Sequence, residues 1–473
     1  MQKFSKFTKT KSKQKLLFSI VFILAILVRF WKIEYLPYQS DWDEYAYIFA
    51  GQSLIEIGIP TSVTCFYSDY DIKIIKNIKA TLPSLVSHNS EESYDFVQPW
   101  FDHTPLLPLI VGSWVKLFGY NFPSHIPSLI YRLPMLALSA VTLYLIFLIS
   151  KHFFKFNGGI FSLILFGFSP SLIIIQRMVV SENLFIPFLL ITLYLALKNK
   201  PLFFQILFTI LAGLSKITGL ITIPIVGFYY LLKKEYKKTA IYAINSLILF
   251  MIIYGLYGYS IDWPQFIQIL KTQSFKLLGW TNPTYLLSYP SFHRILLMDM
   301  SYYLILILGL VSIFIKSRKL IINYFLTCAI FGSIVLVWIT STENAALGWY
   351  KLPLFTFLSI SAGRMIKNSF NYPLILLLTM TIINNYGLIR YQEHPYPEFW
   401  PFRLFIVLIF GTIFIFSLIP NIKNRFRCLL INILLAIYIL TSIYVIDNYY
   451  ISTCENIVKC PMPLMTLKQL IKP

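Results

Sequence analysis

The sequence contains few charged residues. Asp, Glu, Lys and Arg make up 13% of its 473 residues, whereas they make up about a quarter of a typical soluble domain. Long apolar runs recur along the whole chain, which excludes a soluble protein and indicates an all-α polytopic membrane protein. The short alternating segments of a transmembrane β-barrel are lacking. The sequence also has no repeat, no low-complexity tract and no segment typical of a soluble domain.

Cysteine is also scarce. The five cysteines form no C-x-x-C pair and no zinc-ligand spacing. Cys454 and Cys460 lie six residues apart in the polar C-terminal tail. They can pair if the tail faces an oxidising compartment, and two unpaired thiols are the equal alternative.

No cleavage site follows the first apolar run. The N-terminus, MQKFSKFTKTKSKQK, carries six lysines, and the apolar run begins at Leu16. This pattern resembles a signal peptide, but no small-x-small site follows, and Arg29, Trp31 and Lys32 come next. We therefore predict an uncleaved first transmembrane helix that starts in the cytoplasm.

The basic residues indicate membrane topology rather than nucleic-acid binding. The net charge is +20, but Lys and Arg occur in short clusters between apolar runs and not on one patch. With these clusters in the cytoplasm, the pattern predicts thirteen transmembrane helices, with the N-terminus inside and the C-terminus outside. The predicted spans cover about 16–34, 129–150, 158–176, 183–197, 201–215, 217–232, 239–259, 295–315, 320–340, 352–366, 372–388, 400–419 and 428–446.

Segment 104–120 is apolar, but a span there would place the next basic cluster outside. We expect it to lie along the interface as a juxtamembrane helix, which suits its prolines and Trp114. The predicted organisation follows. A cytoplasmic basic tail covers 1–15, a transmembrane domain 16–446 with a first exterior loop at about 35–128, and a short exterior tail 447–473.

Ionisable residues gather on the predicted exterior side, where each is a functional candidate because charge near hydrocarbon is costly. They are Asp41, Asp43, Glu44, Asp102, His103, Arg177, Glu182 and Lys216. Each also has a structural interpretation. A solvated or helix-capping acid explains Asp41, Asp43 or Glu182. Snorkelling explains Arg177, and a capped turn explains Lys216. His103 can be a hydrogen-bonded core histidine.

The order of these residues resembles the integral-membrane GT-C glycosyltransferases, above all the protein O-mannosyltransferases and the lipid A aminoarabinose transferase. The resemblance covers roughly residues 16–235 and rests on five motifs in order. They are Asp43-Glu44 with Tyr47, Phe101-Asp102-His103-Thr104-Pro105-Leu106, Arg132-Leu133-Pro134, Ser169-Pro170 with Arg177 and Glu182, and Leu214-Ser215-Lys216. Trp349-Tyr350 with Pro353 adds a sixth, later stretch. His103 and Thr104 depart from the pattern, where the aminoarabinose transferase has Lys and the family has Pro.

The resemblance implies a multi-pass cell-envelope enzyme of the plasma (inner) membrane with an extracytoplasmic active site. Such enzymes move a sugar, with inversion, from a polyprenyl-phosphate carrier to a hydroxyl of a protein, lipid or glycan. It implies that Asp43, or else Glu44, acts on the acceptor, with Glu182 as a further catalytic acid. Asp43 and Glu182 can share a divalent metal, or one acid can hold Arg177. No other cofactor and no nucleic acid is expected.

The resemblance also implies cations for the departing phosphate. The candidates are His103, Arg177, Lys216, Arg294 and Lys351, with Asp41, Tyr47, Asp102, Arg132, Trp349 and Tyr350 in support and Asp102 expected to position His103. Two other classes stay open. A transporter or flippase would place charges near the middle of its spans, in paired halves. A lipid-linked oligosaccharide polymerase or ligase would have its large loop late in the chain.

Overall fold

The computed structural model describes residues 2–34, 37, 42–64, 70–80, 92–124, 126–274, 291–292, 295–296, 299–315, 320–340, 348–367, 371–393 and 424–448. Several predictions concern positions outside these ranges. They are those for Asp41, Arg294, Cys454, Cys460 and the span at 400–419. Asp43 lies in a described helix, but its side chain is outside the description.

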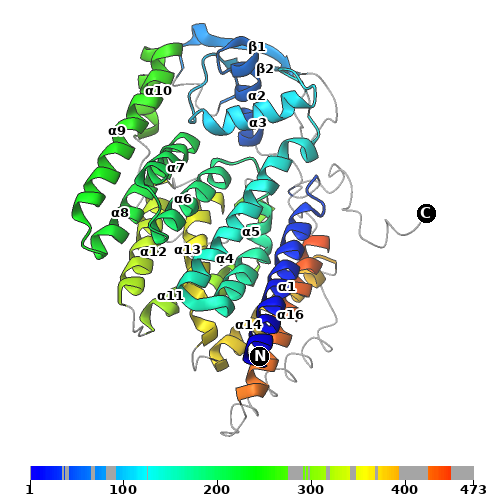
Figure 1. The fold of residues 1–473 in the computed structure, drawn as a ribbon. Coiled ribbons are helices and arrows are strands. Elements are labelled where there is room, and N and C mark those ends of the chain that lie inside the picture. Colours follow the sequence, from blue (N-terminus) through cyan, green and yellow to red (C-terminus); the bar gives the residue numbers. More distant parts are fainter. Residues whose placement is uncertain are drawn as a thin grey trace.

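The described chain is mostly helical, and its helices follow the predicted apolar runs (Figure 1). They are α1 (Gln2–Phe30), α4 (Ser128–Gly167), α5 (Pro170–Ile175), α6 (Ser181–Leu197), α7 (Leu202–Ser215), α8 (Thr222–Leu232), α9 (Tyr236–Ile261), α11 (Met300–Phe314), α12 (Leu320–Thr340), α13 (Leu352–Ala362), α14 (Asn371–Glu393) and α16 (Asn424–Asn448). Short 3-10 turns η3 (Ile217–Ile221), η5 (Gly348–Lys351) and η6 (Met365–Lys367) adjoin α8 and α13. The prediction of a helical fold is confirmed.

Four helices are long and apolar enough to cross a membrane. They are Ser128–Gly167, Tyr236–Ile261, Leu320–Trp338 and Leu429–Asn448. Six shorter apolar helices accompany them within the described residues. The count of thirteen spans, the domain boundaries and the sidedness stay predictions.

Helix α4 is a helical hairpin rather than one rod. Its backbone leaves helical geometry at Phe154 and Lys155, where Lys155 has a φ of +67°. The hydroxyl oxygens of Ser150 and Ser162 lie 2.7 Å apart, whereas twelve residues of straight helix would separate them by about 18 Å. The chain therefore reverses at KHFFK, 151–155, between the second and third predicted spans.

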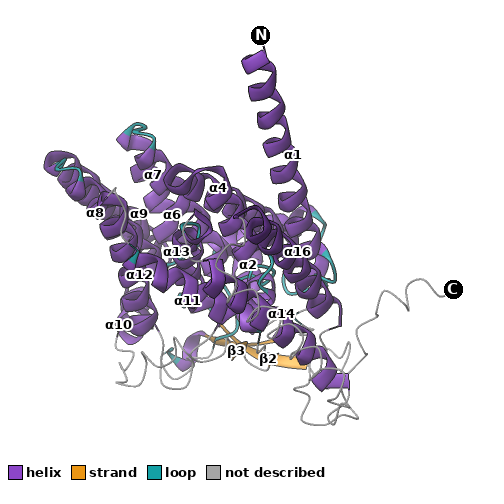
Figure 2. Cartoon of the chain, turned by 90° about the horizontal axis from the view of Figure 1, so that it is seen from below, coloured by secondary structure: helices purple, strands orange, loops and turns teal. Residues whose placement is uncertain are grey.

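One end of the bundle carries a smaller layer, which we call the hairpin end. It contains α2 (Trp42–Ile57), η2 (Ile72–Ile74), β1 (Ile75–Ala80), β2 (Glu92–Val97) and α3 (Leu106–Leu117). The antiparallel strands pair from Ile75 with Val97 to Ala80 with Glu92. Figures 1 and 2 both show the N-terminal end of α1 far from these strands. Helix α10 (Trp263–Ser274) and the two-residue strands β3 (Ser291–Phe292) and β4 (Ile295–Leu296) complete the described elements.

Two clusters of buried apolar side chains hold these layers. The larger fills the bundle from α1 to α16. The smaller joins the hairpin end to the facing ends of α4, α6, α7, α9 and α10, through residues such as Phe49, Phe96, Val111, Tyr131 and Phe266. Burial of apolar surface thus ties the hairpin end to the bundle.

Helices α2 and α3 touch backbone to backbone at two glycines. A Cβ atom at Gly51 would lie 1.9 Å from the carbonyl oxygen of Pro108, and one at Gly112 would lie 2.3 Å from the carbonyl carbon of Gly51. No side chain fits at either position without moving the helices apart. The spacing of α2 and α3, and hence of the loops that follow them, depends on these glycines.

Gly51→Ala should lower the thermal midpoint of the purified protein in detergent. The added methyl group must displace backbone, which costs about 1–3 kcal/mol or more. Gly255→Ala is the matched control, because Gly255 lies within α9 with nothing within 4 Å of a Cβ there. That control should be neutral or slightly stabilising, by up to about 1 kcal/mol. Equal midpoints for both variants would contradict the close contact.

Candidate functional site

A buried ion pair joins α2 to α4 at the hairpin end. Arg132 Nε donates to Glu44 Oε1 at 3.2 Å, and its Nη2 donates to Oε2 at 2.9 Å. Both side chains are fully buried. Glu44 Oε1 also accepts the backbone N–H of Val179 at 2.8 Å, and Arg132 Nη1 donates to the carbonyls of Ile33 and Pro37. Glu44 therefore holds three segments together, and both its oxygens are engaged.

Two further buried arginines bind carbonyl groups near the ends of α1 and α4. Arg177 Nη2 donates to the carbonyl oxygens of Val28 and Trp31, at 2.6 and 2.7 Å. Arg29 donates to the carbonyls of Gly167 and Phe166 and to the side chain of Gln176. Carbonyl groups at helix ends lack intrahelical partners. These arginines supply donors to them where the surroundings are apolar.

An aromatic cluster stands beside this ion pair. The ring of Tyr47, one turn after Asp43 on α2, lies 4.8 Å from the ring of His103. The ring of Trp100 lies 5.6 Å from His103 and 6.1 Å from Tyr47. The hydroxyl of Ser181, at the start of α6, donates to the hydroxyl of Tyr47 at 2.7 Å. This cluster brings α2, the loop before α3 and the start of α6 together.

Glu182, the residue after Ser181 in α6, forms an ion pair at the site. Glu182 Oε1 lies 2.5 Å from Nζ of Lys216, which follows α7, and both side chains are largely buried. Nζ of Lys216 also lies 4.5 Å from the centre of the Tyr350 ring. The carboxylate and the aromatic face together hold the lysine side chain in place. Trp349, buried, and Tyr350 arrive from η5.

Hydrogen bonds from two side chains earlier in the sequence hold Asp102 in place. Its carboxylate accepts hydrogen bonds from the hydroxyls of Thr64, at 2.5 Å, and Tyr70, at 2.7 Å. Gln273 of α10 donates to the Asp102 carbonyl. Burial, with Asp102 beside it, raises the pKa of Tyr70, so the phenol stays a donor. These bonds fix the loop from Trp100 to Thr104. The expected effect of Asp102 on His103 stays a prediction.

Lys351 is buried at the end of η5. Its Nζ lies 5.4 Å from the centre of the Tyr302 ring, and burial lowers the pKa of Lys351 to about 8. A lysine in such surroundings changes charge near neutral pH.

The metal prediction has no support from the described side chains. Among the described residues, no group of three or more His, Cys, Asp and Glu side chains is placed to hold a metal ion. Glu182, one of the two predicted ligands, binds Lys216. The side chain of Asp43, the other, lies outside the description. A shared metal therefore stays a prediction.

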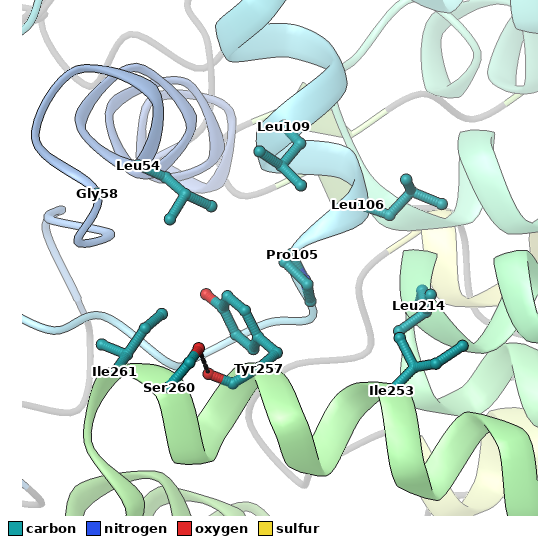
Figure 3. A pocket seen from close by; sticks show the side chains of 10 residues that line it. All are labelled: Leu54, Gly58, Pro105, Leu106, Leu109, Leu214, Ile253, Tyr257, Ser260 and Ile261. Carbon is teal, nitrogen blue, oxygen red and sulfur yellow. Dashed lines mark hydrogen bonds between the residues drawn. The ribbon is translucent and has the colours of Figure 1, made fainter.

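An apolar cavity of about 430 Å³ lies at the hairpin end (Figure 3). Its walls come from the end of α2, the start of α3 and the C-terminal ends of α7 and α9. Two lining residues join it to the site along the chain, since Pro105 follows the His103 loop and Leu214 lies two residues before Lys216. Tyr257 and Ser260 are its only residues with polar side chains among those that line it.

The structure therefore brings together most of the predicted site residues that it describes. Tyr47 and His103 form one contact group, and Glu182, Lys216 and Tyr350 form a second. Ser181, which binds Tyr47, precedes Glu182 and links the two groups along α6. Glu44, Arg132 and Arg177 lie behind them, bound to each other or to backbone. Trp100 and Arg29 were not predicted, because an aromatic residue in an exterior loop and an arginine after an apolar run are typical of membrane interfaces.

Comparison with known proteins gives matches in structure alone, since no family model and no curated sequence matches the chain. ArnT from Cupriavidus metallidurans bound to undecaprenyl phosphate has a TM-score of 0.55 at 12% identity, over 91% of this chain and 76% of that one. Its apo structure has a TM-score of 0.52 at 12% identity, over 91% and 75%. The oligosaccharyltransferase AglB from Archaeoglobus fulgidus, at TM-score 0.49, 10% identity and 93% and 56% coverage, is too distant to support an argument.

The chain shares the fold of ArnT. The resemblance predicted from its motifs is confirmed at the level of fold. With the four long apolar helices, this fold indicates a helical membrane protein. The membrane in which it resides stays a prediction.

Arg132→Met should destabilise the protein by about 3–5 kcal/mol, because it leaves the Glu44 carboxylate buried without its cation. The double variant Glu44→Met with Arg132→Met should recover part of that loss. Recovery should be incomplete because the carbonyls of Ile33 and Pro37 lose their donor. Lys116→Met, which breaks an exposed pair with Glu56, should cost less than about 1 kcal/mol. Chemical unfolding in detergent measures all four proteins, and equal losses for Arg132→Met and Lys116→Met would contradict this account.

Lys351→Met should stabilise the protein at pH 7 and lose that advantage as the pH rises. Folded Lys351 releases its proton near pH 8, whereas the unfolded side chain does so near its ordinary value of 10.5. The wild type therefore gains stability between those pH values. Thermal midpoints at pH 7 and 9.5 test this, with Lys351→Arg as the variant that stays charged. Parallel behaviour of all three proteins would refute the burial of a charged amine.

Proposed function

We propose that this protein is an inverting glycosyltransferase that uses a polyprenyl-phosphate sugar. The observation that carries the proposal is an apolar cavity whose lining residues Pro105 and Leu214 stand two positions from His103 and Lys216 in the chain. A lipid-linked sugar donor needs an apolar site for its prenyl chain and, next to it, a positively charged site for its phosphate. ArnT, which shares the fold, was solved with undecaprenyl phosphate, and this supports the same class of carrier here.

The cavity is the proposed site of the prenyl chain next to the phosphate. Leu106, Leu109, Leu214 and Ile253 give it branched aliphatic walls, as Figure 3 shows. Burial of isoprenoid surface against such walls is favourable by about 25 cal/mol per Å². His103 and Lys216, which flank the cavity along the chain, are the proposed phosphate contacts. Lys351 is a further candidate, and it contributes a charge only below about pH 8.

Asp43 is the proposed general base. It precedes Tyr47 by one turn of α2, and residues four apart share a helix face. That face belongs to the aromatic cluster of His103 and Trp100. Glu44 is the weaker candidate, because its two oxygens bind Arg132 and the Val179 N–H. We assign Glu44 and Arg132 the role of positioning the start of α2.

The proposed reaction is a single displacement. The acceptor hydroxyl oxygen forms a bond to C1 of the sugar while the bond from C1 to the phosphate oxygen breaks. Asp43 accepts the hydroxyl proton, and the polyprenyl phosphate leaves with the bonding electron pair. Cations near the phosphate stabilise the charge that develops on it. Glu182 holds Lys216 in place for this role.

Asp43→Asn should lower sugar release from the correct lipid-linked donor by at least about a hundredfold, since general-base catalysis contributes about 10²–10⁴. The assay uses purified protein in lipid with a panel of polyprenyl-phosphate sugars. Asp95→Asn, an exposed change on β2, is the matched control and should keep full activity. Activity that survives in Asp43→Asn would move the base to Glu182. A wild type that releases no sugar from any lipid-linked donor would overturn the function itself.

A further inference from the structure

The loop before α3 contains two buried polar atoms without a partner. Trp100 and Thr104 are each only 2% exposed. The Trp100 indole Nε1–H and the Thr104 hydroxyl have no hydrogen-bond partner among the described residues. A buried polar group that bonds to nothing costs about 1–3 kcal/mol. Such groups in a folded protein therefore call for an explanation.

Two other tryptophans, Trp114 and Trp31, show the ordinary arrangement. Trp114 Nε1 donates to the carbonyl of Ile130 at 2.9 Å, and Trp31 Nε1 donates to the carboxylate of Asp447 at 2.9 Å. The loop that holds Trp100 is itself well bonded, because Asp102 binds Thr64 and Tyr70 within it. The free donor of Trp100 is therefore a local feature and does not reflect a loosely packed loop.

Both residues belong to the loop that carries His103, a proposed phosphate contact. The Trp100 ring contacts His103 and Tyr47. Thr104 stands between His103, a proposed phosphate contact, and Pro105, which lines the cavity. The sugar is joined directly to the phosphate, so it must occupy the space near His103 and Tyr47. Thr104 is also the position at which the chain departs from the proline of the resembled motif.

We infer that Trp100 and Thr104 recognise the sugar of the donor through one of its hydroxyl groups. The inference rests on the proposed function. An indole N–H is a donor only, so it takes an acceptor oxygen, and a threonine hydroxyl both donates and accepts. A sugar hydroxyl offers both functions, an oxygen that accepts and an O–H that donates. A phosphate oxygen satisfies the indole as well, and the test separates these two sources.

If Trp100 binds the donor, Trp100→Phe should be the milder of two variants in thermal stability and the more damaging one in kcat/KM, compared with Trp114→Phe. Without donor, Trp100→Phe removes a buried N–H that bonds to nothing, so its thermal midpoint should fall less than that of Trp114→Phe, which loses a real hydrogen bond. With donor, Trp100→Phe should lose about 10–100-fold in kcat/KM, because the sugar hydroxyl loses its donor. Trp114→Phe should stay within about threefold of wild type.

The decisive experiment compares four folded proteins: wild type, Trp100→Phe, Thr104→Val and Trp114→Phe. Each is assayed with the active donor, with the same donor lacking single sugar hydroxyls, and for binding of sugar-free polyprenyl phosphate. We expect Trp100→Phe and Thr104→Val to lose discrimination against one deoxy donor and to bind sugar-free carrier as wild type does. Thr104→Val, which is close to Thr in volume, keeps the test valid if Trp100→Phe does not fold.

Three results would overturn the inference. Unchanged kcat/KM in both variants would show that neither atom meets the substrate. An equal loss of affinity for sugar-free carrier would assign the two atoms to the phosphate instead. Retained discrimination against every deoxy donor would exclude a sugar hydroxyl. A wild type inactive with all lipid-linked sugars is a separate outcome, because it refutes the proposed function before the variants are compared.

Discussion

The buried pair of Glu44 and Arg132 is the interaction on which the hairpin end depends. It joins the first turn of α2 to α4 and, through Val179 and the carbonyls after α1, to two further segments. A charge inside an apolar protein is tolerable only when it is paired and hydrogen-bonded. Here the same groups that neutralise each other also bond the backbone of the segments around them. The position of Tyr47, three residues further along α2, follows from that anchor.

The site is assembled from segments that are distant in sequence. The start of α6, the turn after α7 and η5 each adjoin a bundle helix, and the His103 loop of the hairpin end reaches the start of α6 through Tyr47. Each segment contributes one kind of chemistry: aromatic rings from the loop, a carboxylate from α6, an ammonium group from the turn after α7. The apolar cavity adds a site for hydrocarbon beside them. In the proposed function, the polar reaction and the hydrocarbon carrier therefore meet at this end of the molecule.

Much of the helical layout could be predicted, because basic clusters such as KHFFK and KSRK separate the apolar runs. The polar residues of the cluster were also found, since Glu182 and Lys216 are unusual beside apolar helices. Their partners were not predictable. The contact of Glu44 with Arg132 spans 88 residues and depends on how α2 packs on α4. The β1–β2 hairpin was missed because IKNIKA lacks the alternation of a half-buried strand. Trp100 was missed because its unpartnered N–H is visible only in three dimensions.

The reversal within α4 bears on the order in which the chain acquires its structure. The two arms of α4 meet through Ser150 and Ser162, so the helical hairpin of α4 is closed by contacts between residues only twelve positions apart. Gly158 and Ser150 also lie against Gly363, some 200 residues later. Local contacts form fast and need little chain, and long-range contacts must wait for the rest of it. During synthesis, the two arms of α4 can therefore pair before α13 emerges, and the end of α13 then packs against Ser150 and Gly158.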